Sequence, residues 1–443
     1  MNQVERRESR LPERLAELGG TSSDYTNDIL GRTARTRQRP AWTFPGRWFP
    51  MLFHSPDRPM ASTMPSRMVW ILLIVALLAA ALAAGGAFIV GSGVLRGPGP
   101  NDLSAVLAAL PPTACPAGTP LHHGDIATIA GTGKFGSTGD GAAALAASLY
   151  TSDAVPALDS LGNLYFYDRY SREIRRVTTD GLIDKYYAPD SMADNAVGLG
   201  MDPADDLLVA DYAHNRIWQV APDGTVTSLA GTGQPYTTFT PGPADQTTIG
   251  LTQVARGPDG SLYFDGAYGF AVVTPDGMVQ AFAGTATPGF SGDGGPVGKA
   301  QLSDETEAVA VDAVGNIYLG DTNNHRIRKV TPAGIITTFA GNGTNGWAGD
   351  GGQATDASLG LPIGVAVDTD GTVYISDQGT STVRKVTPAG VISTVAGTGT
   401  AGYSGDCGPA AAAELGHPYG IAVRDGVLYI MDEDNYRVRM VVP

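Results

Sequence analysis

Cysteine and histidine are scarce in this chain, which has two cysteines and six histidines among its 443 residues. The sequence also lacks an HExxH segment, a phosphate-binding glycine loop and a recognisable Ser/His/Asp arrangement. Catalysis needs groups that converge on one point. We therefore expect a protein that is not an enzyme and that binds no metal ion or cofactor.

Charged residues are also few, at 16% of the chain, whereas glycine (59) and proline (30) are abundant. This composition is typical of a turn-rich globular protein with a real core. Eleven arginines, no lysine and seven acidic residues precede residue 68, which leaves 18 basic and 37 acidic residues, a net charge of −19, after it. The absence of a basic stripe in this acidic part argues against nucleic acid as a partner.

One long uncharged run, residues 68–90, interrupts the sequence. At about 1.5 Å per residue, a helix of this length crosses a bilayer core of about 30 Å. The arginines before it place the N-terminus in the cytosol by the positive-inside rule. We predict a disordered cytosolic tail (1–67), a transmembrane helix (68–90) and a linker (91–122), with the rest outside the plasma membrane of the cell. A cleaved secretion signal is the alternative, although the leader is long for one.

The remainder is built from a repeated block of four short strands. In "GVAVDTDGTVYISDQGTSTVRKVTPAGVISTVAG" an apolar strand, a Gly/Asp turn, a strand ending in Asp, a polar loop, a third strand and a Pro-Gly hairpin follow one another. Six strand-ending aspartates mark six blocks: Asp168, Asp211, Asp265, Asp321, Asp377 and Asp432. Four antiparallel strands per block are typical of a propeller blade.

The sixth block stops before its fourth strand, and residues 123–131 supply the missing half. Gly124 is followed seven residues later by Gly131, the spacing found after the Pro-Gly hairpins of the other blocks. Joining Pro443 to His123 restores that hairpin. We therefore predict an all-β fold, a six-bladed β-propeller over residues 123–443 that is closed by pairing of its N-terminal strand with the last blade.

The pattern "GVAVD…GNIYLGDTNNHRIRKVTPAG", with "GDGG" between blocks, resembles the NHL-repeat family. The resemblance implies a six-bladed propeller used mostly for binding. It also implies that the strand-end Asp and an Arg five residues later brace the loop between strands. Arg216, Arg326 and Arg437 occupy that position in three blades, and Glu173, Phe270 and Thr382 occupy it in the others.

Some propellers of this kind are enzymes, so an exported metal-dependent lyase or lactone hydrolase is the alternative function. Lyase-like members bind metal through several histidines near the propeller axis, where this sequence has only His417. A mainly structural envelope protein is a third possibility.

Five loops between blades are long, roughly 24 residues each, and we expect them on the face opposite the Pro-Gly hairpins. Because the chain enters at a hairpin, this long-loop face is expected to point away from the membrane. We predict that it binds a protein, peptide or glycan through Glu307, His417, Tyr419, Trp347 and Tyr403.

Three of these loops carry an aromatic residue followed by Gly-Asp-X-Gly, at Phe290, Trp347 and Tyr403. One interpretation is a set of rings that face a ligand. The other is structural, with each ring covering a neighbouring blade while its Asp caps a turn.

Cys115 and Cys407 both fall after the predicted span, where a disulfide could persist. The sequence alone leaves open whether they pair.

Overall fold

The computed structural model describes residues 110–187, 196–236, 239–266, 269–285 and 287–442. The chain divides into two units, Met1–Val94 and Leu95–Pro443, and all described residues belong to the second. The predicted tail, the predicted transmembrane helix and most of the predicted linker lie outside the described residues. Within the described ranges no helix has the length and apolar character needed to cross a membrane.

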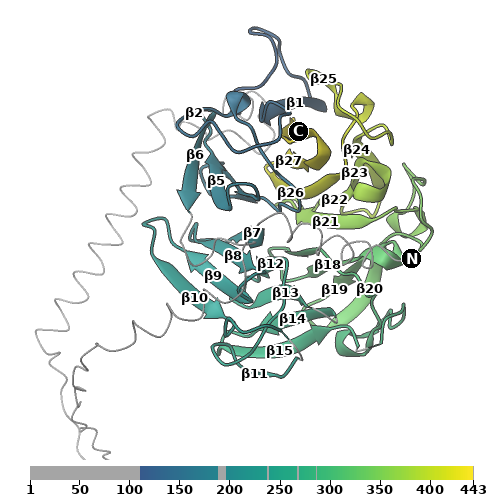
Figure 1. The fold of residues 1–443 in the computed structure, drawn as a ribbon. Helices are drawn as coiled ribbons and strands as arrows, with labels where there is room; N and C mark the ends of the chain where they lie inside the picture. Colours follow the sequence, from purple (N-terminus) through teal and green to yellow (C-terminus); the bar gives the residue numbers. More distant parts are fainter. Residues whose placement is uncertain (1–109, 188–195, 237–238, 267–268, 286, 443) are drawn as a thin grey trace, which may run out of the picture. The chain divides into compact units, whose positions relative to one another are not determined.

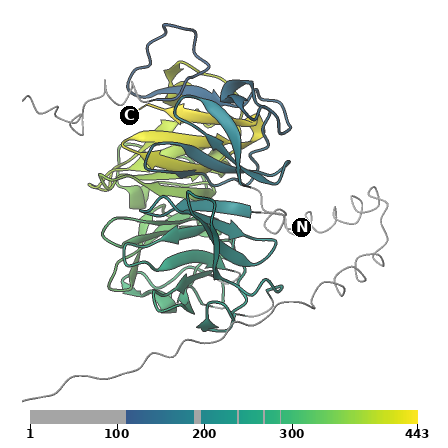
Figure 2. The ribbon, with the colours of Figure 1, turned by 90° about the vertical axis from the view of Figure 1, so that its left-hand side faces the viewer.

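The described residues form six antiparallel sheets arranged in a ring. Figure 1 shows this ring along its axis, and Figure 2 shows it from the side. Each sheet is one predicted block, numbered here blade 1 to blade 6 in chain order. The all-β, six-bladed propeller predicted from the sequence is thereby confirmed.

Blade 1 consists of β3 (Ala157–Leu158), β4 (Leu164–Asp168), β5 (Glu173–Val177) and β6 (Leu182–Tyr187). Blade 2 consists of β7 (Ala196–Met201), β8 (Leu207–Asp211), β9 (Arg216–Val220) and β10 (Val226–Ala230). Blade 3 consists of β12 (Val254–Arg256), β13 (Leu262–Gly266), β14 (Gly269–Val273) and β15 (Met278–Ala283). Blade 4 consists of β17 (Val309–Val311), β18 (Ile317–Asp321), β19 (Arg326–Val330) and β20 (Ile335–Ala340). Blade 5 consists of β21 (Pro362–Val367), β22 (Val373–Asp377), β23 (Thr382–Val386) and β24 (Ile392–Ala396). Blade 6 consists of β26 (Pro418–Arg424), β27 (Val427–Asp432), β28 (Arg437–Val441) and β1 (Asp125–Ala130).

Short outer strands and single-turn 3₁₀ helices complete the described chain. The outer strands are β2 (Ala142–Ala143), β11 (Gly242–Pro243), β16 (Gly295–Pro296) and β25 (Gly408–Pro409). The 3₁₀ helices are η3 (Ala144–Ala146), η4 (Val297–Lys299), η5 (Thr322–Asn324), η6 (Ala354–Asp356), η7 (Gln378–Thr380), η8 (Ala410–Ala412) and η9 (Glu433–Asn435).

Hairpins that contain a glycine join the third and fourth strands of blades 1 to 5, as predicted. In blade 4 the Gly334 N–H donates to the Thr331 carbonyl (2.8 Å), and Gly334 has φ +75°. A residue with a side chain is strained at that φ, which explains the glycine at this point of the repeat. Apolar side chains on both faces of each sheet then pack against the neighbouring blades, because a blade in a ring has no solvent-exposed face.

The ring is closed by β1, the first strand of the domain. It pairs antiparallel with β28, with Ile126 opposite Val441. The Gly124 N–H donates to the Val442 carbonyl (3.0 Å), and the Val442 N–H donates to the Asp125 carbonyl (2.9 Å). The predicted closure is therefore confirmed over the described residues.

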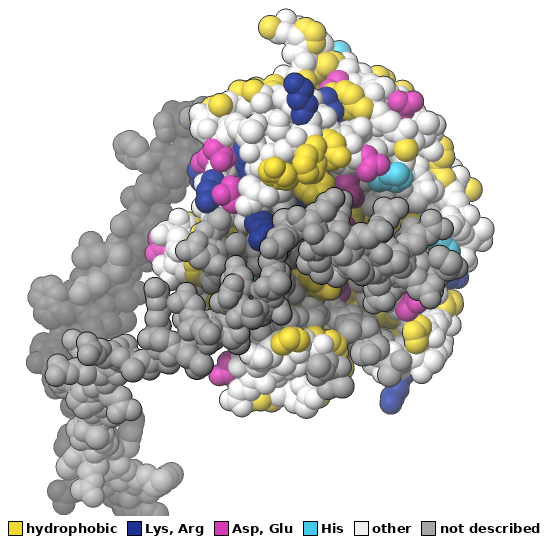
Figure 3. Space-filling view, viewed as in Figure 1, with side chains coloured by type: hydrophobic (Ala, Val, Ile, Leu, Met, Phe, Trp, Pro, Cys, Tyr) yellow, Lys and Arg dark blue, Asp and Glu magenta, His cyan; other side chains and the backbone are white. Residues whose placement is uncertain are grey.

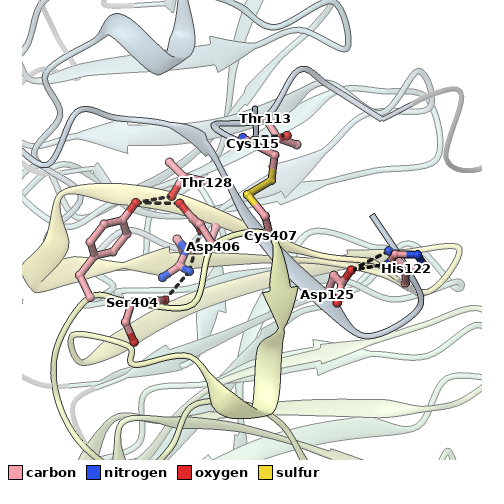
Figure 4. The surroundings of a disulfide bond; sticks show 10 residues. Thr113, Cys115, His122, Asp125, Thr128, Ser404, Asp406 and Cys407 are labelled. Atoms are coloured by element: carbon pink, nitrogen blue, oxygen red, sulfur yellow. Dashed lines mark hydrogen bonds and ion pairs between the residues drawn. A yellow bond between two sulfur atoms is a disulfide. The ribbon is translucent and has the colours of Figure 1, made fainter. Parts of the chain in front are cut away.

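A disulfide between Cys115 and Cys407 lies beside this closure (Figure 4). Their Cα atoms are 5.6 Å apart, and 292 residues separate them in sequence. The Ala114 N–H also donates to the Thr128 carbonyl in β1 (2.8 Å). The segment that leads into the propeller is thus attached to the outer edge of blade 6 by a covalent bond and a hydrogen bond.

The long loops follow a different path from the expected one. Each begins and ends on the long-loop face, but its middle part runs along the outer edge of the next blade. In blade 4 the outer strand β16 pairs with β20, with Gly295 opposite Ile336, and the Gly294 N–H donates to the Ile336 carbonyl (2.8 Å). Much of each loop therefore forms hydrogen bonds with the backbone of the edge strand. A smaller part of the loop lies on the long-loop face than we expected from its length.

Candidate functional site

The six strand-end aspartates are buried, and four of them lie beside a buried arginine seven residues later in the chain. In blade 4, Arg328 donates through Nη1 to Asp321 (3.1 Å) and through Nη2 to Asp293 (2.6 Å) in the long loop. Arg328 and Asp321 are both 0% exposed. The equivalent buried arginines are Arg175, Arg384 and Arg439, which bind the loop aspartates Asp140, Asp350 and Asp406. These ion pairs hold the outer loops to the blades.

This network corrects the expectation that the arginine five residues after the Asp is the partner. Arg326 instead donates to the carbonyls of Asn324 and Asn342 (both 2.8 Å) and lies over the Phe290 ring, 3.8 Å from its centroid. Arg437 lies in the same way over Tyr403, also at 3.8 Å. The arginines at this position therefore brace loops through carbonyl oxygens and rings.

Blade 3 has no arginine at the seventh position, where Val272 stands. Burial accordingly raises the pKa of Asp265 to about 6, although the side chain of Thr252 and the backbone N–H groups of Gln253 and Thr252 donate to it. Burial also raises the pKa of Asp168, Asp377 and Asp432, against the lowering effect of their arginines.

Trp347 and Tyr403, both predicted ligand contacts, lie at the outer edges of blades 5 and 6. Trp347 Nε1 donates to Thr394 Oγ1 in β24 (2.9 Å). The Tyr403 hydroxyl donates to Asp406 (2.7 Å) and bonds Thr128 Oγ1 in β1 (3.2 Å; Figure 4). The two rings are 43% and 40% exposed. Their contacts match the structural interpretation, in which each ring covers a blade, here its own outer strand.

Glu307 and Tyr419, in contrast, meet at the centre of the ring. Glu307 precedes the inner strand β17 of blade 4, and Tyr419 lies in the inner strand β26 of blade 6. The Tyr419 hydroxyl donates to Glu307 Oε2 (3.2 Å). Burial, followed by the neighbouring Glu305, raises the pKa of Glu307 to about 8, and burial raises the pKa of Tyr419 well above its usual value. The two groups are therefore neutral near pH 7, and a neutral carboxyl group can donate as well as accept a hydrogen bond.

A second carboxyl group, Glu433, extends this axial cluster and was missed by sequence reasoning. It begins η9, directly after the strand-end Asp432. Ser152 Oγ of blade 1 (2.8 Å) and Gln378 Nε2 of blade 5 (3.4 Å) donate to it. Burial raises its pKa to about 7. The available signal was its position directly after the strand-end Asp432.

His417, the remaining predicted contact, lies close to Glu433 at the rim of this cluster. Its Nδ1 contacts Asp434 Oδ2, and the two side chains are 48% and 58% exposed. The structure thus brings Glu307, Tyr419 and His417 to one end of the ring and leaves Trp347 and Tyr403 at its periphery.

The axial cluster can donate and accept hydrogen bonds. Its groups are carboxyl groups, a phenol, a hydroxyl and an amide, and they line the mouth formed by the inner strands. Among the described residues no three His, Cys, Asp or Glu side chains lie close enough to hold a metal ion. On the face that Figure 3 shows, the described Lys and Arg side chains stand in small groups rather than in a stripe.

Six sheets closed by the first strand define the class of this domain as a six-bladed β-propeller, and its repeat is similar to the NHL repeat. The family model of the teneurin NHL domain matches residues 342–403. Mouse teneurin-3 is 29% identical over 214 residues, which are 44% of this chain and 8% of that protein. The chain therefore matches less than a tenth of the length of this relative.

Two solved structures share the fold. A structural genomics protein of unknown function from Bacteroides thetaiotaomicron has a TM-score of 0.55 at 20% identity, covering 71% of this chain and 75% of that one. An auxiliary nutrient binding protein from Bacteroides ovatus has a TM-score of 0.52 at 18% identity, with the same coverage. At these identities the likeness shows the fold alone.

Proposed function

We propose that this protein is a membrane-tethered binding module that presents its NHL propeller outside the cell. The tether is the uncharged run at residues 68–90, with an arginine-rich segment before it that favours a cytosolic N-terminus. A disulfide between Cys115 and Cys407 supports an oxidising compartment for the propeller, because disulfides seldom persist in the cytosol. The similarity to teneurin NHL domains supports a binding role over a catalytic one.

The proposed ligand is a protein, peptide or glycan that contacts the centre of the long-loop face. The observation that carries this proposal is the Tyr419–Glu307 pair, two partly buried polar groups outside the Asp-Arg network that holds the blades together. Burying a carboxyl group without a cationic partner has a free-energy cost, and a ligand that bonds it offsets that cost. Glu433 and His417 extend the same surface.

The proposed orientation is supported by the point where the chain enters the propeller. Pro112 packs against the blade 1 hairpin, since a Cβ built on Gly181 would lie 2.6 Å from Pro112 Cδ. We therefore propose that the long-loop face, with Glu307 and Tyr419, is the face available to a ligand outside the cell.

Trp347 and Tyr403 are secondary contacts in this proposal. They lie at the outer edges of blades 5 and 6, so only a ligand that extends from the axis to the rim can reach them. Binding that is sensitive to Glu307→Gln but not to Trp347→Ala or Tyr403→Ala would identify a small or compact ligand.

The binding test uses the full chain in detergent against glycan and peptide arrays, with a pull-down from the source cell's envelope fraction. Glu307→Gln and Tyr419→Phe are expected to weaken binding at least tenfold, because each removes a group that a ligand would bond. Asp276→Ala, in the blade 3 hairpin, is the matched control. Binding that survives both axial substitutions but is lost in the hairpin variant would overturn the proposal.

Topology is tested separately with protease added to intact cells that express the chain with tags at both ends. We expect loss of the C-terminal tag and protection of the N-terminal tag. Metal analysis of the same preparation addresses the alternative: stoichiometric zinc or calcium would favour a metal-dependent lyase or lactone hydrolase.

A further inference from the structure

The fourth strand of each blade contains a β-bulge, and the bulge residue faces the second strand. Register shifts mark these positions, which hold Tyr186, Leu229, Phe282, Phe339, Val395 and Ile129 in blades 1 to 6. In three blades an aromatic bulge residue packs edge-to-face on a tyrosine of the second strand. The pairs are Tyr186–Tyr165, Phe282–Tyr263 and Phe339–Tyr318, with centroids 4.7 to 4.9 Å apart.

Blade 5 has the tyrosine but not the second ring. Tyr374 occupies the second-strand position and Val395 the bulge. A cavity of about 500 Å³ lies at this point between blades 5 and 6, lined by Tyr374, Val395 and Leu428 among others. The bulge of blade 6 is also aliphatic, but there Leu110 and Leu121 of the leading segment pack on the cluster that contains Tyr429.

The polar groups of this cavity are not fully used by the protein. Tyr374 is 7% exposed and lines the cavity. Asp368 and Asp370 act on its hydroxyl through their charge, without a hydrogen bond. The hydroxyls of Tyr165 and Tyr318, at the same position in other blades, donate to Asp159 (2.9 Å) and Asp312 (3.4 Å). An unpartnered hydroxyl beside an open volume is a group that a ligand can bond.

The charge of the lining is predominantly negative. Asp125, Asp368 and Asp370 line the cavity, and the titratable groups that face them are Lys385 and His123. Burial, then Asp368 and Asp370, raises the pKa of Tyr374 to about 12, which reflects how close these carboxylates are to the phenol. The site therefore combines a ring-sized space with an anionic rim.

We propose that this cavity binds a small molecule consisting of one aromatic ring joined to a cationic amine. The ring packs on Tyr374 where Phe339 packs on Tyr318 in blade 4, and the ammonium group faces Asp368 and Asp370. Edge-to-face packing and charge attraction in a half-enclosed cavity both favour such a ligand. The site lies beside the hairpins and is separate from the axial cluster.

The test is ligand-observed NMR and a thermal shift on the full chain in mild detergent, with 2-phenylethylammonium as the probe. Two matched probes separate the contributions: 3-phenylpropanoate keeps the ring and reverses the charge, and butylammonium keeps the charge without the ring. We expect 2-phenylethylammonium to bind at least tenfold more tightly than either. Equal binding of all three, or no binding of the first at millimolar concentration, would overturn the proposal.

Val395→Phe supplies the missing ring and should reduce binding of the probe at least tenfold, with no decrease in the melting temperature. Phe339→Val, which removes the equivalent ring from blade 4, is the control and should leave the blade 5 site intact. Lys385→Gln should strengthen binding of the probe, and Asp370→Asn should weaken it. These two surface changes test the proposed site even if Val395→Phe does not fold. Unchanged affinity in this pair contradicts the proposed role of charge. Glu307→Gln should have no effect, which separates this site from the axial one.

Discussion

The hydroxyl of Tyr419 donates a hydrogen bond to Glu307 and thereby joins blade 6 to blade 4 at the centre of the ring. Burial and Glu305 raise the pKa of Glu307 to about 8 from an ordinary value of 4.5. The folded protein therefore holds a proton on Glu307 that the unfolded chain has released. The contribution of Glu307 to the free energy of unfolding is therefore fully present below pH 4.5 and is lost as the pH rises through 8.

Glu307→Gln removes this titration and should become progressively more stable than the unmodified protein as pH rises from 5 to 8. We expect a relative gain of about 1–3 kcal/mol across that range, since each pKa unit corresponds to about 1.4 kcal/mol. Urea unfolding at pH 5, 6, 7 and 8 measures it. Tyr419→Phe is the control: without the donated hydrogen bond the pKa of Glu307 rises further, so the loss of stability should extend to higher pH. A stability difference that is constant with pH would contradict this account of Glu307.

The Cys115–Cys407 bond should stabilise the closed ring, because it attaches the leading segment to blade 6 beside the closing strand β1. Replacing both cysteines with serine is expected to lower the free energy of unfolding by about 2–5 kcal/mol. Guanidinium unfolding of the oxidised protein against the double variant measures the loss, and reduction of the unmodified protein should reproduce it. If the double variant is as stable as the oxidised protein, the β1–β28 pairing alone is sufficient for closure.

The fold could be predicted because one local pattern recurs in every blade. The strand-end Asp and the hairpin glycines have fixed spacing, and the interval from Gly124 to Gly131 showed that the first strand completes the last blade. The Asp-Arg partner could not be predicted in the same way. Asp321 lies directly opposite Arg326 in register, yet the bond comes from Arg328, two residues further along the same face. The spacing in the sequence allows either Arg326 or Arg328 as the partner of Asp321, and only the path of each long side chain decides between them.

The candidate site was predicted in part. Glu307, Tyr419 and His417 were assigned to the long-loop face, and the structure brings the three together at the mouths of the inner strands. Trp347 and Tyr403 were assigned to the same surface because their loops are long, but loop length does not determine loop path. The loops fold along the outer edge, since an edge strand has unpaired N–H and C=O groups that they can satisfy.

Arg328 should be essential for blade 4, because its guanidinium pairs with the fully buried Asp321 and with Asp293 of the outer loop. Arg328→Met leaves the Asp321 carboxylate buried beside an apolar side chain. We expect a loss of about 3–5 kcal/mol in the free energy of unfolding, the usual effect of removing one partner of a buried ion pair.

Arg326→Met is the matched control in the same strand. Arg326 is only partly buried and bonds carbonyl oxygens, so its loss should cost about 1 kcal/mol. Urea unfolding of the two variants at pH 7 compares them. Equal losses would mean that the Asp321–Arg328 pair has no special role in holding the loop to the blade.

Gly420 should be required for the close approach of blades 6 and 1 at the axis. A Cβ at this position would lie 2.2 Å from the Ala154 carbonyl oxygen and 2.6 Å from Val155 Cα. Both are backbone atoms of the neighbouring blade, so Gly420→Ala must push two inner strands apart. We expect a loss of about 2–4 kcal/mol, as for overpacked cores.

Gly141→Ala separates this steric effect from backbone strain. Gly141 has φ +76° and no atom within 4 Å of a built Cβ, so alanine there is strained but unobstructed, and a loss of about 1 kcal/mol is expected. Thermal unfolding ranks the two variants. Because Tyr419 adjoins Gly420, Gly420→Ala should also displace the Tyr419 hydroxyl from Glu307. Glu307 then gains access to water, which returns its pKa toward the ordinary value. The pH dependence of stability between pH 5 and 8 should therefore become flatter. A variant that loses stability but keeps that pH dependence would show that the axial pair is held independently of the inner-strand spacing.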